Sequence, residues 1–217
     1  MIDPAHGGTD TGARGQNGVI EKDIVLQFAR VARGELARQG YRVVLTRDDD
    51  ANPSYDDRAA LANSYRDAIF VSLHISSTGT PGTAHAYYYQ FWKSIPSASQ
   101  SGSYGDDRSQ APVPLSVPPP TALLPWNEAQ RAYGGASQRL ADQLQGQLAS
   151  LFSGSPQASA GVELRGLRSV AAPAVDIEVS SVSVTDAKSL TVLAGPLAAS
   201  IAKGIQTFRA ANSAGAK

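Results

Sequence analysis

Four residues of the types that hydrolytic sites use stand at points where the chain passes from one expected element to the next: His6, Glu21, His74 and Glu178. The two histidines and Glu178 each follow a short apolar run typical of a strand, and Glu21 opens a helical pattern. Ligands of open α/β sheets bind beyond the carboxyl ends of strands. If these strands are parallel neighbours, the four side chains meet at one edge. Glycines between His6 and Glu21 allow the chain to double back there.

Two imidazoles and one carboxylate form an open zinc-binding set, which leaves a fourth tetrahedral position for water. His6, Glu21 and His74 supply that set. A further carboxylate is then needed to take a proton from the water and return it to the leaving amine, and Glu178 is the natural choice. A histidine at the end of a strand is also commonly structural. The residues by themselves therefore leave a metal site and a structural role both open.

Composition excludes several other kinds of site. The 217 residues include no cysteine, so disulfides and thiolate metal sites are excluded. Lys+Arg and Asp+Glu both number 19, and this zero net charge argues against a nucleic-acid partner. No apolar run approaches the roughly 20 residues that span a membrane. No signal peptide is visible either, and we expect that an upstream segment has been removed.

The elements that must position these residues alternate between strand and helix. Apolar periodicity predicts a helix over residues 21–39, and Ser54 with Asp57 resembles a capping box that opens a second helix. Gly195 and Pro196 are expected to interrupt the last helical stretch. Strands are expected at residues 1–2, 41–46, 69–73, 84–91 and 174–179. This pattern predicts one α/β domain over residues 1–217, with a mostly parallel, twisted sheet of about six strands and helices on both faces.

One long segment departs from the alternation. Residues 93–125 are dense in Ser, Pro, Gly and Gln, and a structureless stretch of this length is unusual within a domain. We interpret it as a surface insertion that forms a mobile loop. A lid or regulatory flap over the site is the alternative.

Five motifs carry a resemblance to a known family. The chain reads IDPAHGGTDTGA at residues 2–13, GVIEKD at 18–23, GYRVVLTR at 40–47, FVSLH at 70–74 and PAVDIE at 173–178. In this order and spacing the motifs resemble those of the zinc N-acetylmuramoyl-L-alanine amidases, the "amidase 3" family. The resemblance runs from residue 2 to about residue 208, apart from the insertion.

The resemblance implies one zinc ion held by His6, Glu21 and His74, with Glu178 as general base and acid. It implies cleavage of the amide between N-acetylmuramic acid and L-alanine in peptidoglycan, and a location in the cell envelope, either periplasmic or at the cell wall after secretion. We expect a monomer, and an activator protein is left open. Some members of the family carry a plug over the zinc, and Asp106 or Asp107 in the insertion would suit that role.

Several residues near the motifs differ from the family pattern. Ala5 replaces a usual Gly, and the residues after His74 and Glu178 are unusual. Asp176 stands at a commonly apolar position, where a buried carboxylate needs a partner. We expect it either to assist Glu178 or to pair with Arg165 or Arg168. His85 is either a substrate contact, an alternative ligand, or a strand residue at the rim of the site.

Two further functions compete with the amidase. One is another zinc peptidase that acts on the stem peptides of peptidoglycan. The other is a metal-free module of the same fold that binds the cell wall without turnover, which the unusual residues after His74 and Glu178 favour. Product analysis separates the first from an amidase, and metal content separates the second.

Overall fold

The computed structural model of the chain describes residues 1–15, 18–91, 124–180 and 187–214. The expected insertion at 93–125 lies almost wholly outside these ranges, so its assignment stays a prediction. Within the described ranges, no helix is both long and apolar enough to cross a membrane.

Five strands of the described chain form one sheet in the order β1-β2-β5-β3-β4. Their bounds are β1 (Ile2–Pro4), β2 (Phe70–Ser76), β3 (Thr83–Tyr89), β4 (Ala160–Val162) and β5 (Ala174–Ser180). All neighbouring pairs are parallel except β3 with β5. The predicted mostly parallel sheet is therefore confirmed.

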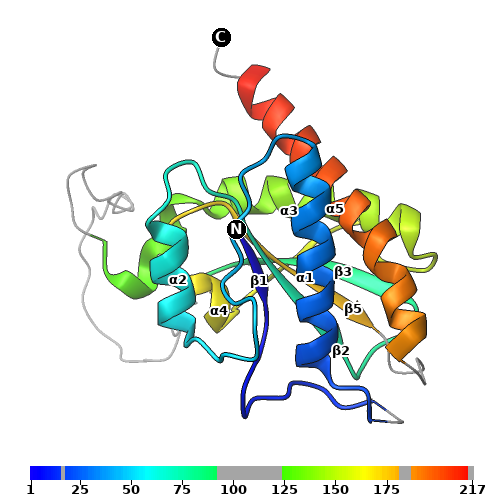
Figure 1. Ribbon diagram of the computed structural model, residues 1–217. Helices are drawn as coiled ribbons and strands as arrows, with labels where there is room; N and C mark the ends of the chain where they lie inside the picture. The colour runs from blue at the N-terminus through cyan, green and yellow to red at the C-terminus, as the bar shows by residue number, and fades with distance from the viewer. Residues whose placement is uncertain (16–17, 92–123, 181–186, 215–217) are drawn as a thin grey trace, which may run out of the picture.

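Helices cover both faces of this sheet, as predicted (Figure 1). Three long helices, α1, α3 and α5, pack with the apolar sheet face into the main core. The shorter α2 and α4 share a second core on the other face, built around Phe70, Tyr89 and Leu167. The helices are α1 (Glu21–Arg38), α2 (Tyr55–Asn63), the 3₁₀ helix η2 (Trp126–Ala132), α3 (Gly134–Leu151), α4 (Arg165–Arg168) and α5 (Ala187–Ala214).

The strand expected at residues 41–46 does not form, and Pro4 explains why. Ile2 N–H donates to the carbonyl of Val44 at 2.9 Å, and Thr46 N–H donates back to Ile2 at 3.1 Å. The next bond of a parallel ladder would need an N–H at Pro4, which proline lacks. The pairing therefore stops at a single bridge between Ile2 and Leu45.

The interruption expected at Gly195 and Pro196 is also wrong, because α5 continues through Pro196. Proline cannot donate to the carbonyl four residues earlier, at Val192. Val192 is 69% exposed, so water can satisfy the carbonyl that this leaves free. By contrast, the predicted capping box of α2 is present: Ser54 Oγ accepts from Asp57 N–H, and the Asp57 side chain accepts from Ser54 N–H.

The strands β2 and β5 extend beyond their expected ends, so the site does not lie where the sequence predicted. Residues His74 and Glu178 lie inside the strands, because Ile75 and Val179 continue the apolar alternation beyond them. Alternate side chains of a strand point to opposite faces. The side chains of His74 and Glu178 therefore point to the sheet face opposite the main core, rather than only beyond the strand ends.

Candidate metal centre and its cleft

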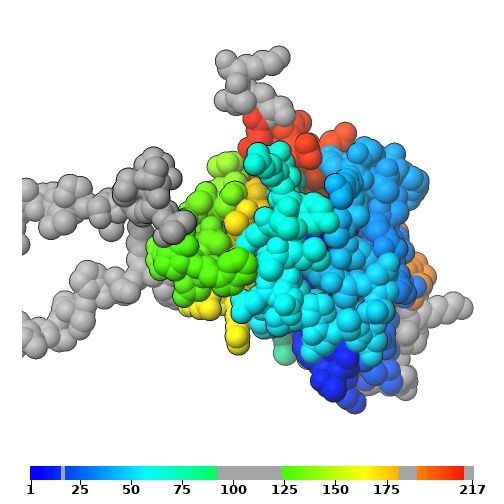
Figure 2. Space-filling model, turned by 60° about the vertical axis from the view of Figure 1, so that its left-hand side comes forward, coloured from blue at the N-terminus to red at the C-terminus, as the bar shows by residue number. Residues whose placement is uncertain are grey.

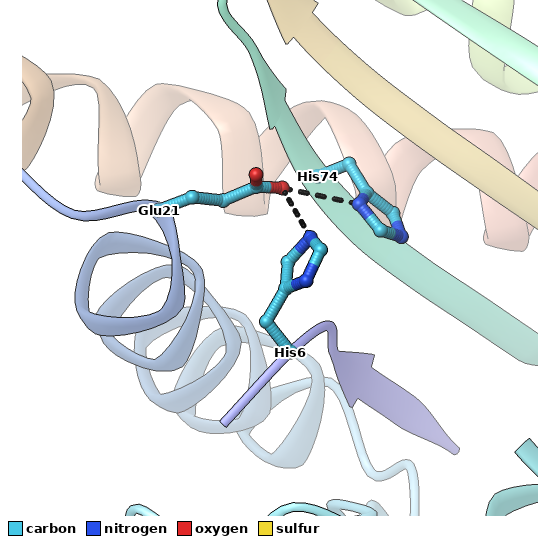
Figure 3. A group of neighbouring side chains, drawn as sticks. All are labelled: His6, Glu21 and His74. Atoms are coloured by element: carbon cyan, nitrogen blue, oxygen red, sulfur yellow. Dashed lines mark hydrogen bonds and ion pairs between the residues drawn. The ribbon is translucent and has the colours of Figure 1, made fainter. Parts of the chain in front are cut away.

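His6, Glu21 and His74 meet at one point, as the sequence predicts (Figure 3). One ligand atom from each lies within 4.8 Å of the other two. Glu21 Oε1 is 3.1 Å from His6 Nε2 and 3.1 Å from His74 Nδ1. The two imidazole rings stand edge to face, with centroids 5.1 Å apart. Three elements supply these groups: the loop after β1, the first residue of α1, and the middle of β2.

The loop after β1 is bent sharply to present His6. His6 has φ of 61° and Gly7 has φ of 133°, both in the left-handed region. The bend is held by Arg58, which donates to the carbonyls of His6 at 2.8 Å and Pro4 at 3.1 Å. Arg47 donates to the carbonyls of Pro4 and Ala5, both at 2.8 Å. The strain at His6 is therefore offset by bonds that fix its backbone.

Glu21 is fixed more firmly than either histidine. Its side chain is 5% exposed, and its Oε1 accepts the N–H of Ile75 at 2.9 Å while its Oε2 accepts the N–H of Ala13 at 2.7 Å. Burial alone would raise the pKa of Glu21. Hydrogen bonds from His6, His74 and these two amides outweigh it and hold the pKa well below its usual range. Glu21 is thus an oriented carboxylate whose charged form the site favours.

Asp10 orients the ring of His6, a role that the sequence analysis missed. Asp10 Oδ2 is 2.9 Å from His6 Nδ1, while Asp10 Oδ1 accepts the N–H of Gly12 at 3.1 Å. This arrangement leaves His6 Nε2 directed at Glu21. A carboxylate on the far nitrogen of a histidine is the usual partner of a metal-binding imidazole. The sequence did offer a signal for this role, because Asp10 belongs to the same motif as His6 and lies four residues after it.

The donor set fits a zinc ion. Zinc prefers imidazole nitrogen and carboxylate oxygen at about 2.0–2.1 Å, which places tetrahedral ligand atoms about 3.3 Å apart. The Glu21–histidine separations of 3.1 Å are close to that value. In the described part of the chain, no fourth His or carboxylate joins the group. The set therefore has the composition of an open site, in which one position is left for water or substrate.

Glu178 stands beside this group on the same sheet face. The register of β2 and β5 pairs His74 with Glu178, so their side chains are direct cross-strand neighbours. Glu178 and the three clustered residues also line one cleft of about 650 Å³. The convergence of all four predicted residues is thus present in the structure.

Asp176 lies deeper on this face, where the register pairs it with Ser72. Its Oδ2 is 3.7 Å from His74 Nε2, and it forms no ion pair with Arg165 or Arg168. Its Oδ1 is buried without a hydrogen-bond partner among the described residues. Burial and the neighbouring Glu178 raise the pKa of Asp176 to about 6, against the lowering effect of His74. Asp176 therefore lies near Glu178, as one alternative expected, and near His74, which the sequence did not indicate; it does not pair with the arginines.

The pKa of His74 reflects the same neighbours. Burial favours the neutral ring, but the Asp176 charge and the hydrogen bond to Glu21 raise the pKa of His74 to about 9. The pKa of His6 is raised as well, by its bond to Glu21 against burial, with help from Asp10. Without a metal ion, the site is therefore a place where positive charge is favoured. This is the electrostatic condition for binding a cation.

His85 lies outside the three-residue group. The register pairs it with Glu178 across β3 and β5, and its ring packs against that of Tyr87 at 4.4 Å. Its Nε2 is buried and has no hydrogen-bond partner among the described residues. His85 is therefore a neighbour of Glu178 on the sheet rather than a fourth member of the cluster.

Comparison with known proteins places these features in a family. The family model described as N-acetylmuramoyl-L-alanine amidase matches residues 1–207. The chain is 38% identical over 81 residues to the amidase AmiC of Neisseria meningitidis serogroup B, which covers 37% of the chain and 20% of AmiC. It is 41% identical over 84 residues to the sporulation-specific amidase of Bacillus subtilis, which covers 38% and 32%. The matched part thus spans a third or less of these relatives.

Solved structures share the fold at lower identity. An N-acetylmuramoyl-L-alanine amidase from Clostridium difficile 630 superposes with a TM-score of 0.65 at 23% identity, covering 95% of this chain and 94% of the other. The CwlD amidase from Clostridioides difficile, described in complex with the GerS lipoprotein, gives 0.69 at 19% identity, covering 97% of both. These structures support the α/β architecture.

Proposed function

This chain belongs to the N-acetylmuramoyl-L-alanine amidase family, and from that premise we propose that it is a zinc-dependent hydrolase of the amide bond between N-acetylmuramic acid and L-alanine in peptidoglycan. The observation that carries the proposal is the cluster of His6, Glu21 and His74 beside Glu178 in one open cleft. The proposed setting is the cell envelope, where that substrate lies.

In this proposal, His6, Glu21 and His74 would hold one zinc ion. When bound, the ion would supply Lewis-acid chemistry, polarising the scissile carbonyl and making water nucleophilic near neutral pH. The chain's own contribution is to fix the ligands before the ion arrives. Asp10 orients His6, and the amides of Ala13 and Ile75 orient Glu21. Such preorganisation keeps the ligand atoms from moving during reaction.

Glu178 is the proposed proton carrier. It is half-buried in the cleft, and no ion pair within the described chain neutralises it. Its carboxylate accepts a proton from the attacking water, whose oxygen bonds to the carbonyl carbon of the muramoyl group. The carbon–nitrogen bond then breaks, and Glu178 returns the proton to the leaving amine. The products are a lactyl carboxylate on the sugar and a peptide with a free L-alanine amino group.

The test is a digest of purified peptidoglycan with the zinc-loaded chain, read by mass spectrometry. An amidase releases stem peptides that begin with L-alanine, and chelation abolishes that release. Cleavage within the stem peptide, with the sugar-linked amide intact, would instead support the zinc peptidase. A chain that binds peptidoglycan without turnover and without metal would support the binding module.

The same assay tests whether the chain needs a partner protein. We propose that the purified chain is active alone, as a monomer. One neighbour, CwlD, is described in complex with the lipoprotein GerS, so an activator is the alternative. Activity that appears only after addition of a cell-envelope extract would favour the activator.

A further inference from the structure

The cleft extends beyond the metal centre, and its outer wall holds a cation that the proposed chemistry does not use. Residues at the start of α2, including Tyr55 and Asp56, line one side, and residues of α4, including Arg165 and Gly166, line the other. Figure 2 shows this part of the surface, where α2 (cyan) lies beside η2 (green). Trp126 Nε1 of η2 donates to Asp56 Oδ1 at 2.9 Å, which ties the two elements together.

Two arginines of the described chain line the cleft, and they differ in their partners. Arg58 is buried, and its guanidinium is fully engaged by the Asp3 carboxylate and the carbonyls of the His6 loop. Arg165 is exposed and forms no ion pair or hydrogen bond with any described residue. Its five N–H groups are therefore available to a ligand.

Arg165 is nevertheless held in place. Its guanidinium carbon lies 5.5 Å from the centroid of the Tyr55 ring, within the range of a cation–π contact. The Tyr55 ring also lies close to Gly166, where an added Cβ would approach Tyr55 Cε1 to 3.3 Å. The Tyr55 ring thus packs on α4 and helps to orient Arg165. A partly ordered guanidinium loses less freedom when it binds a planar anion.

The charges around Arg165 give it a selective role. The remaining ionisable groups of the cleft are largely acidic, and they include Asp10, Glu21, Asp56 and Glu178. Arg165 is the arginine of the cleft that no described carboxylate neutralises, so it can bind an anionic group of the substrate. Guanidinium matches carboxylate geometry with two parallel hydrogen bonds.

We propose that Arg165 binds a carboxylate of the substrate on the peptide side of the scissile amide, and so sets the position of the peptide in the cleft. This assignment rests on the proposed function. The sugar of a muramoyl peptide presents hydroxyl and acetamido groups, whereas its carboxylates belong to the peptide. The matching substrate class is therefore a muramoyl peptide that carries a free carboxylate on the residue after L-alanine, rather than its carboxamide.

The test compares two synthetic muramoyl dipeptides that differ only in this carboxylate or carboxamide. Arg165→Ala is expected to lower kcat/KM for the carboxylate substrate about tenfold, through KM, as expected for loss of a charge-assisted hydrogen bond. The same variant is expected to leave the carboxamide substrate within about twofold. Arg165→Lys keeps the charge and is expected to recover part of the loss. Arg139→Ala, an exposed arginine on α3, is the matched control and is expected to change neither substrate.

The outcomes separate this inference from the function on which it rests. If the wild-type chain cuts both substrates, and Arg165→Ala changes both equally or neither, the carboxylate assignment is overturned while the amidase stands. If the wild-type chain cuts neither substrate, the proposed function fails and the assignment fails with it. Circular dichroism of each variant verifies the fold, since the exposed Arg165 contributes no buried contact.

Discussion

Gly12 offers a sharp test of the metal centre because it touches two of the three proposed ligands. It has φ of +63°, and an added Cβ would lie 2.5 Å from Glu21 Oε2 and 2.6 Å from His6 Cδ2. Neither side chain can yield freely. Glu21 Oε2 is bonded to the amide of Ala13, and the His6 ring is bonded to Asp10. Gly12→Ala therefore forces at least one ligand out of position.

Gly12→Ala has two effects whose magnitudes can be estimated separately, one on folding free energy and one on zinc affinity. The left-handed backbone costs an L-residue about 1–2 kcal/mol of folding free energy. Displacement of an oriented ligand is expected to lower zinc affinity roughly 10- to 100-fold. This is the loss that follows when a hydrogen-bond partner that orients a metal ligand is removed. Gly40→Ala is the matched control. Gly40 has φ of +84° and nothing within 4 Å of an added Cβ, so it pays only the backbone cost.

The assay is competition for zinc against a chromophoric chelator, with chemical denaturation of the same metal-free samples. Both variants are expected to lose unfolding free energy, and Gly12→Ala is expected to lose more because the clash adds to the backbone cost. Only Gly12→Ala is expected to lose zinc affinity. Equal zinc affinity in the wild type and both variants would refute the assignment of His6 and Glu21 as ligands.

Three other outcomes follow from the geometry. Glu178→Gln is expected to lower kcat about 10²- to 10⁴-fold and to leave zinc content unchanged, which metal analysis of the inactive variant checks. Asp10→Ala is expected to lower the affinity for zinc about 10- to 100-fold. An unchanged affinity in a competition titration would show that Asp10 does not orient His6 for metal binding. In the metal-free chain, the pKa of His74 is raised from 6.5 to about 9. Its contribution to stability is therefore fully present below about pH 6.5 and is lost as pH rises through 9, which denaturation between pH 6 and 10 measures.

The sequence was sufficient for the parts of the fold that local patterns govern. Apolar periodicity and the capping box at Ser54 predict α1 and α2 within a residue or two. The meeting of His6 with His74 follows from the parallel pairing of β1 with β2. The place of Glu21 follows from a helix that starts beside these strands. Each inference needs only the type of element and the direction of the chain.

The parts that could not be predicted depend on contacts between distant segments. Arg47 belongs to the third motif and Arg58 to the helix that Ser54 opens, yet their bonds to the His6 loop span more than 40 residues. The same holds for Asp176, whose neighbours depend on the register of β5 against β2 and β3. The end of the ladder at Pro4 requires knowing which strand lies at the edge. Such details follow from packing rather than from propensity.

The most direct measurement of the central claim is the metal content of the purified chain beside that of His74→Ala, after loading with zinc and dialysis. Three ligands on one ion predict about one zinc per wild-type chain and nearly none in the variant. No zinc in the wild type, or equal zinc in both, would contradict a site shared by His6, Glu21 and His74.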